Sequence, residues 1–259
     1  MDTDDYLIDG VLNEMLGIIN VNPHIVIFSW RYELGDAEYN INNNNLHGRV
    51  YQRAFLDKYN IHFSEQGSYA NEDVGFNHIC RLILFTYYPN NNAVLTLNKS
   101  VIMYDTDDME SITRRNNRAF IYKEQNMGLA YNAIHVYNVC KEDNVSEGML
   151  KDYLSDIMGS QYFFFVRTLE ERPEYLQEAW DGARYFYINL FKNIIKEEPE
   201  LNISYRRMLN FYKNAYQKPP RLRFNIKLFM RLLDEHEEVP EYYKTLAENS
   251  DTIEEENDR

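Results

Sequence analysis

The chain has 259 residues, which is enough for one large domain or two small domains with a buried core. A hydrophobic content of 44% and an aromatic content of 15% exclude a wholly disordered chain. The formal net charge of −14 at pH 7 disfavours a nucleic-acid partner, because phosphates repel an acidic surface.

Two further features predict the compartment. No run approaches the roughly 20 apolar residues of a membrane span, and the acidic opening lacks the basic and apolar segments of a secretory signal. Cys80 and Cys140 lie among apolar neighbours without metal-binding or redox spacing, which is typical of reduced, buried thiols. The sequence therefore predicts a cytoplasmic protein and leaves a peripheral position at a membrane open.

The first part of the chain alternates between helical and strand patterns. A helix is expected over 6–20, and a β-branched and aromatic strand over 24–30. Helical spacing returns over 49–59 and again from Asn71, where Asn71 can cap a helix that has Glu72 and Asp73 in its first turn. The apolar run 79–85 predicts that this helix is buried. Two short strands are expected next, over 93–97 and 100–104.

From Arg114 onward the pattern is helical almost throughout. The clearest helices are predicted over 147–158, 175–196, 205–216 and 224–235. The polar run 40–45 is expected to be a loop. The end, 248–259, has six acidic residues, one basic residue and no apolar cluster, which predicts a disordered acidic tail.

Two acidic clusters carry the candidate chemistry. Asp2 and Asp4 precede a predicted helix, where carboxylates can hold a hard divalent cation that suits a diphosphate. Asp73 follows Glu72 at the start of another helix, where one carboxylate facing a cleft can act as a general base towards a hydroxyl. Both clusters are also explained by helix capping and a favourable helix dipole, and each motif by itself favours that simpler interpretation.

Four segments in order resemble the family-2 glycosyltransferases of the GT-A fold, especially the bacterial enzymes that build lipopolysaccharide and capsule. That family has segments of the types DSDDYL, WGKLYRRSFL, IRFPEG…EDVxF and YxYR…SIT. The matching segments here are DTDDYL at 2–7, HGRVYQRAFL at 47–56, IHFSEQG with EDVGF across 61–76, and Tyr104 with SIT at 111–113. Beyond Arg118 the resemblance does not continue.

The resemblance implies a role for each matching residue. Asp2 and Asp4 match the DxD pair, which in the family binds the nucleotide ribose and the Mn²⁺ or Mg²⁺ on the diphosphate. Asp73 matches the aspartate that takes the proton from the hydroxyl acceptor as this attacks the anomeric carbon, with inversion of configuration. Glu72 and Arg49 match residues that make secondary contacts with the acceptor or with the nucleotide-sugar donor.

Three departures qualify the resemblance. His47 and Ser64 replace the family's usual tryptophan and proline. In the family, the parallel half-domain that binds the nucleotide precedes the DxD segment, which opens this sequence. The expectation is that the chain alone does not turn over a nucleotide sugar. A sheet edge beside 25–30 is then expected to be exposed, and to be covered by a companion chain or by self-association.

One stretch is strongly basic, although the chain as a whole is acidic. From Ser204 to Arg231 the chain has eight basic residues and no acidic residue, interleaved with aromatic side chains. Such a stretch can contact a polyanion. The favoured interpretation is that these cations neutralise the acidic remainder of the protein.

The sequence thus predicts an α/β fold: the acceptor-side half of a GT-A domain over 1–115, a mainly helical region over 116–247 and the acidic tail over 248–259. The predicted function is a metal-dependent, inverting transfer of a sugar from a nucleotide sugar to a hydroxyl acceptor. The alternative is a non-catalytic binding or assembly protein derived from a glycosyltransferase.

Overall fold

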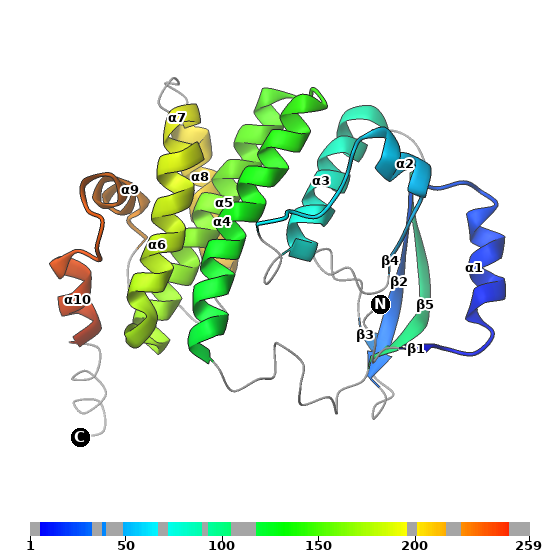
Figure 1. The fold of residues 1–259 in the computed structure, drawn as a ribbon, viewed down its shortest axis with the longest axis horizontal. Coiled ribbons are helices and arrows are strands. Elements are labelled where there is room, and N and C mark those ends of the chain that lie inside the picture. Colours follow the sequence, from blue (N-terminus) through cyan, green and yellow to red (C-terminus); the bar gives the residue numbers. More distant parts are fainter. Residues whose placement is uncertain are drawn as a thin grey trace.

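The computed structural model describes residues 6–32, 38–39, 49–66, 72–89, 93–104, 118–195, 201–215 and 224–248. A small sheet lies at one end of the molecule, and a row of helices extends from it towards the C-terminus (Figure 1). The predicted loop over 40–45, the boundary at 115–116 and the acidic tail after Glu248 lie outside the described residues.

The sheet is mixed, and the described residues form five of its strands: β1 (Tyr6–Leu7), β2 (Ile25–Tyr32), β3 (Glu38–Tyr39), β4 (Arg49–Tyr51) and β5 (Val94–Tyr104). The long strands β2 and β5 are parallel neighbours. On the other side of β2, β4 pairs antiparallel with its beginning and β3 with its end. On the outer side of β5, β1 pairs antiparallel at Ile102 and Met103. The strand predicted over 24–30 is confirmed as β2.

The two short strands predicted over 93–97 and 100–104 form the single strand β5. Its pairing with β2 is irregular at the predicted break, because Phe28 pairs with Leu97 whereas Ser29 pairs with Ser100. The residues Asn98 and Lys99 therefore lie in a bulge, where two extra residues of β5 do not end the strand.

The prediction of an exposed edge beside 25–30 is wrong. The structure pairs Ile25, Val26 and Ile27 with β4 on one side and with β5 on the other. The prediction failed because 49–51 was expected to be helical. These residues form β4, and the helix α2 (Arg53–Lys58) begins only afterwards. Among the described residues, the outer edge of β5 between Val94 and Val101 has no strand partner, and neither have the outer sides of the short strands β1, β3 and β4.

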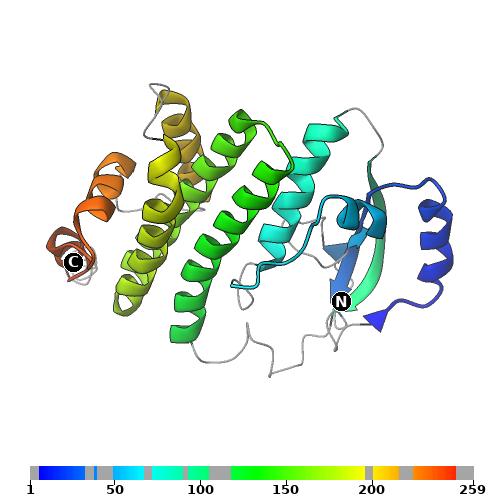
Figure 2. The same ribbon diagram turned by 45° about the horizontal axis from the view of Figure 1, so that its top comes forward.

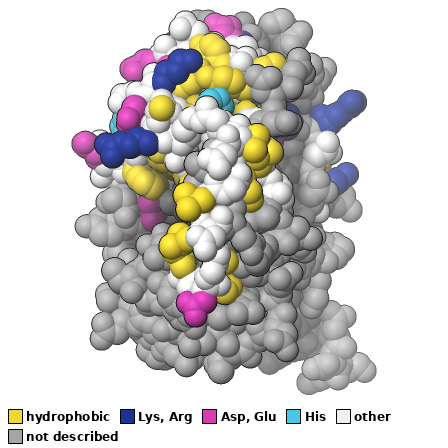
Figure 3. Space-filling model, turned by 90° about the vertical axis from the view of Figure 1, so that its right-hand side faces the viewer, with side chains coloured by type: hydrophobic (Ala, Val, Ile, Leu, Met, Phe, Trp, Pro, Cys, Tyr) yellow, Lys and Arg dark blue, Asp and Glu magenta, His cyan; other side chains and the backbone are white. Residues whose placement is uncertain are grey.

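Helices cover both faces of the sheet (Figures 1 and 2). Strand alternation directs Ile25 into the main core on one face and Val26 to the other face, where it packs against Val11 of α1 (Val11–Ile19). The helix predicted over 6–20 thus begins later than expected, after Gly10, which adopts a left-handed conformation at φ 79°. The outer side of α1 carries Leu12 and Leu16, each 58% exposed, on a face with scattered apolar side chains (Figure 3).

Helix α3 (Glu72–Tyr87) joins the sheet to the helical region. Its residues Ile79, Cys80, Ile83 and Leu84 are buried as predicted, whereas Phe85 is 60% exposed. Neither cysteine forms a disulfide, and burial raises the pKa of both thiols to about 12. The predicted burial of Cys80 and Cys140 is therefore confirmed.

The helical region predicted from Arg114 is confirmed over its described residues. It comprises α4 (Arg118–Glu142), α5 (Glu147–Glu171), α6 (Leu176–Phe186), a π-helical turn (Tyr187–Phe191), α7 (Lys192–Ile195), α8 (Leu201–Ala215), α9 (Ile226–Glu235) and α10 (Glu241–Glu248).

The core of this region is aromatic. Trp180 is fully buried and lies against Phe165, Phe229 and Tyr243, with ring centroids 5.6–6.0 Å away. These rings belong to α6, α5, α9 and α10, so the last helices are held to the body of the protein by offset and edge-to-face aromatic packing. In the part of the chain that the structure describes, no helix is both long and apolar enough to cross a bilayer.

Candidate functional site

The first turn of α3 carries the two acidic residues that the sequence analysis selected. Glu72 and Asp73 are both half-buried. The Asp73 Oδ1 accepts a hydrogen bond of 2.8 Å from the backbone N–H of Val74. Carboxylates in the first turn of a helix interact favourably with the positive end of the helix dipole. Asp73 therefore stabilises α3 independently of any catalytic role.

Strand β4 brings two more polar side chains to α3. Arg49 and Tyr51 are two residues apart, so they point to the same face of the sheet. Both donate to the side chain of Asn77, which is fully buried: the Arg49 Nη1 lies 2.9 Å and the Tyr51 hydroxyl 2.5 Å from Asn77 Oδ1. Asn77 lies four residues after Asp73, on the same face of α3.

The charge of Asp73 has a small effect on the same group of side chains. Burial raises the pKa of Tyr51 well above its usual value, the guanidinium of Arg49 opposes that rise, and the charge of Asp73 adds to it. The phenol therefore stays protonated and remains a donor to Asn77. The cluster thus combines a carboxylate, a guanidinium and two neutral hydrogen-bonding groups, held between β4 and α3.

The structure brings together Asp73, Arg49 and, in the same helical turn, Glu72. Tyr51 and Asn77 were not selected from the sequence, although Tyr51 follows Arg49 with the period of two that indicates a strand. Asp2 and Asp4 lie outside the described residues, so their convergence with Asp73 on one cleft stays a prediction. Within the described ranges, no group of three or more His, Cys, Asp or Glu side chains is arranged to hold a metal ion.

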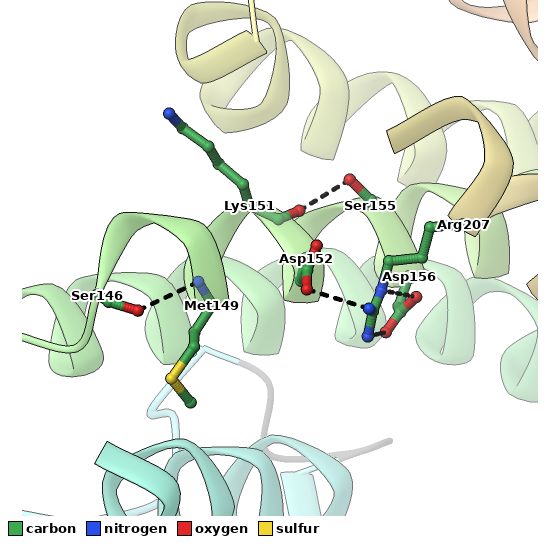
Figure 4. A network of polar contacts seen from close by, with 7 residues as sticks. All are labelled: Ser146, Met149, Lys151, Asp152, Ser155, Asp156 and Arg207. Atoms are coloured by element: carbon green, nitrogen blue, oxygen red, sulfur yellow. Dashed lines mark hydrogen bonds and ion pairs between the residues drawn. The ribbon is translucent and has the colours of Figure 1, made fainter. Parts of the chain in front are cut away.

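The basic stretch is partly explained by its contacts with acidic neighbours. Arg207 of α8 binds both carboxylate oxygens of Asp156, at 2.6 and 2.7 Å, and reaches Asp152 at 3.1 Å (Figure 4). Arg231 pairs with Glu235 at 3.9 Å, one turn further along α9. These contacts support the favoured interpretation for Arg207 and Arg231, that the cations neutralise acidic faces.

A histidine on the neighbouring face of α3 responds to pH. Burial lowers the pKa of His78 from 6.5 to about 4, and the charge of Arg81 lowers it further. Between these two pH values the unfolded chain binds a proton that the folded chain does not, so stability falls as the pH drops through this window. We expect a loss of about 3 kcal/mol by pH 4.

Urea unfolding of the wild type and of His78→Gln between pH 7 and pH 4 measures this loss. The free energy of unfolding should fall more steeply in the wild type, because the variant lacks the titrating group. Other titrating groups, including His135 with its pKa also lowered by burial, are present in both proteins and cancel in the difference. If the free energy of unfolding falls equally with pH in the two proteins, the pKa of His78 is not lowered in the folded state.

No family model matches the chain, and no curated protein matches it. Among solved structures, the chain is similar to the crystal structure of S. aureus TarS, a glycosyltransferase, with 14% sequence identity and a TM-score of 0.49. The aligned part covers 87% of this chain and 41% of the TarS chain. A TM-score below 0.5 does not establish a shared fold.

Proposed function

We propose that this protein is part of a glycosyltransferase that moves a sugar from a nucleotide sugar to a hydroxyl acceptor. The observation that carries the proposal is the position of Asp73. It lies in the first turn of α3, in the segment that resembles the family's EDVxF motif. One turn further along α3, Asn77 accepts hydrogen bonds from Arg49 and Tyr51 of β4, in the segment that resembles WGKLYRRSFL. Two segments that are separate in the sequence and resemble segments of one family therefore lie against each other, which supports the proposal.

In this proposal Asp73 accepts the proton of the acceptor hydroxyl. The hydroxyl oxygen then forms a bond to the anomeric carbon from the side opposite the nucleotide, the bond to the diphosphate breaks, and the configuration inverts. Arg49, which Asn77 holds beside the start of α3, contacts the donor or the acceptor together with Glu72. Asp2 and Asp4 offer the oxygen ligands that Mn²⁺ or Mg²⁺ prefers, and such an ion supplies positive charge to the departing diphosphate.

The proposed enzyme also needs a half-domain that binds the nucleotide. In the described residues, the outer edge of β5 carries a strand only at Ile102 and Met103, and an unpaired edge is a template for a further strand. We propose that this edge receives that half-domain, within one polypeptide or from a companion chain. This position replaces the edge of β2 that the sequence suggested.

Ligand-dependent stabilisation tests the function. In a preparation that also contains the nucleotide-binding half-domain, we expect a nucleotide sugar with Mn²⁺ to raise the Tm, because a ligand at 100 times its Kd stabilises a protein by about 2.7 kcal/mol. The screen uses several nucleotide sugars, each with and without Mn²⁺. Asp4→Asn should lose the Mn²⁺-dependent part of the shift, and Asp9→Asn, which changes an exposed aspartate next to β1, should keep it. A shift that is equal in both variants would contradict the metal site, and no shift with any donor would contradict the enzyme.

The non-catalytic alternative is favoured by one observation. The hydrogen bond from Val74 to Asp73 gives this carboxylate a structural use that needs no substrate. An intact fold with no donor binding would support a binding or assembly protein.

A further inference from the structure

Phe63 presents an aromatic ring to solvent near the start of α3. It lies in the short segment 61–66 that follows α2, and it is 44% exposed. One face of its ring is stacked on the ring of Phe76, with the centroids 4.6 Å apart and the planes 18° from parallel. Because Phe76 covers that face, the exposed part of the ring is its opposite face and its edge.

The ring of Phe76 connects Phe63 to the candidate site. Phe76 is buried and meets the ring of Tyr51 edge-on, with the centroids 5.1 Å apart. It follows Asp73 by three residues, so the two side chains are neighbours on the surface of α3. Phe63 therefore lies beside the group of residues in which Asp73 is the proposed base.

The backbone around Phe63 is anchored on both sides. Ile61 and Ser64 are buried, and the backbone N–H of Ile61 donates a hydrogen bond of 2.9 Å to the carbonyl oxygen of Leu56. The Nε2 of His135 in α4 donates to the carbonyl oxygen of His62 at 3.0 Å. A side chain on a segment fixed in this way loses little freedom when a ligand packs on it, which favours binding.

The same segment carries polar side chains next to the ring. His62 and Glu65 are both exposed, and imidazole and carboxylate groups form hydrogen bonds with hydroxyls. A pyranose matches this combination, because the C–H groups of its faces pack on an aromatic ring while the hydroxyls at its rim form hydrogen bonds. An aliphatic chain would use the ring of Phe63 alone.

We propose that Phe63 is a stacking platform for a pyranose ring of the acceptor, which makes the acceptor a glycan. This inference rests on the proposed function, because the acceptor is the molecule whose hydroxyl Asp73 deprotonates. The exposed face of Phe63 packs on the C–H face of the sugar, and His62 and Glu65 bind hydroxyls at its rim. A nucleobase also stacks on aromatic rings, but in the proposed enzyme the nucleobase is bound by the other half-domain.

Saturation-transfer NMR on the complete chain tests the platform without any donor, metal ion or half-domain. The probes are the methyl β-glycosides of glucose, galactose and N-acetylglucosamine, and uridine serves as the competing ring. We expect a glycoside to bind with a Kd in about the millimolar range, as is usual for a ligand this small. The protons on one face of its ring should receive the strongest saturation.

Three variants separate the platform from general apolar binding. Phe63→Leu keeps apolar packing on Phe76 but removes the flat aromatic face, so it should weaken glycoside binding by about three- to tenfold. Phe63→Tyr keeps that face and should bind like the wild type. Phe85→Ala removes a ring of α3 that is 60% exposed, and should have no effect on glycoside binding. The Tm of each variant shows whether it is folded.

The proposal is overturned if no glycoside binds, if folded Phe63→Leu binds glycosides as tightly as the wild type, or if uridine binding depends on Phe63 and glycoside binding does not. None of these outcomes decides the role of Asp73, because no turnover is measured. If instead Asp73→Asn keeps its turnover while glycosides bind at Phe63, the proposed base is wrong and the sugar-binding surface stands.

Discussion

Replacing Asp73 by asparagine is expected to remove most of the turnover of any preparation that contains the nucleotide-binding half, by about 10²–10⁴-fold. The amide cannot take the proton of the acceptor hydroxyl, although it has nearly the same shape. Its oxygen can still accept the hydrogen bond from Val74, so the helix start should persist. Steady-state kinetics and the Tm, measured on the same preparation, separate the two effects.

The matched control is Asp57→Asn. Asp57 is an exposed aspartate near the end of α2, where it pairs with Arg53 of the same helix. This variant should keep both its turnover and its Tm. Near-normal turnover in Asp73→Asn would show that Asp73 is not the base. A large fall in Tm for that variant would instead identify Asp73 as a capping residue needed for the fold.

Replacing Gly182 by alanine is expected to destabilise the protein by about 1–3 kcal/mol. A Cβ at this position in α6 would lie 2.7 Å from the backbone carbon and oxygen of Asn126 in α4. Backbone atoms of a neighbouring helix cannot rotate away as a side chain can, so the two helices must separate. The clash outweighs the helix propensity gained from alanine, which is about 1 kcal/mol at most. The Tm should fall by about 2–4 °C for each kcal/mol.

Gly148→Ala is the matched control, because it makes the same substitution in the first turn of α5. A Cβ at Gly148 would meet no atom within 4 Å. This variant should therefore be neutral or slightly more stable than the wild type, through its higher helix propensity. If both variants unfold at the same urea concentration, the close approach of α4 and α6 does not limit stability.

Some residues of the candidate site were predicted from the sequence, and others were not. Asp73 and Arg49 were selected from two motifs that lie far apart in the sequence, and the structure places both next to Asn77. Asn77 itself carried no signal, because a single asparagine inside an apolar helical pattern does not reveal what it binds. Its role depends on β4, and that strand was hidden within a segment whose spacing also fits a helix. The sequence also gives no sign that His78 is buried, and only the surrounding helices reveal its buried nitrogen, which lacks a hydrogen-bond partner among the described residues.

The sequence by itself determined the elements whose apolar residues follow one period over many positions. The strand β2 and the helices α3, α5 and α8 are of this kind, because their buried faces are already visible in the spacing of side chains. The tertiary structure decided the short elements and the joining of strands. Arg49–Tyr51 becomes a strand because Val50 can pair with Val26, and β5 remains one strand because β2 supports it on both sides of the bulge. Such pairings are contacts between residues distant in the chain, and their energy does not enter any local pattern.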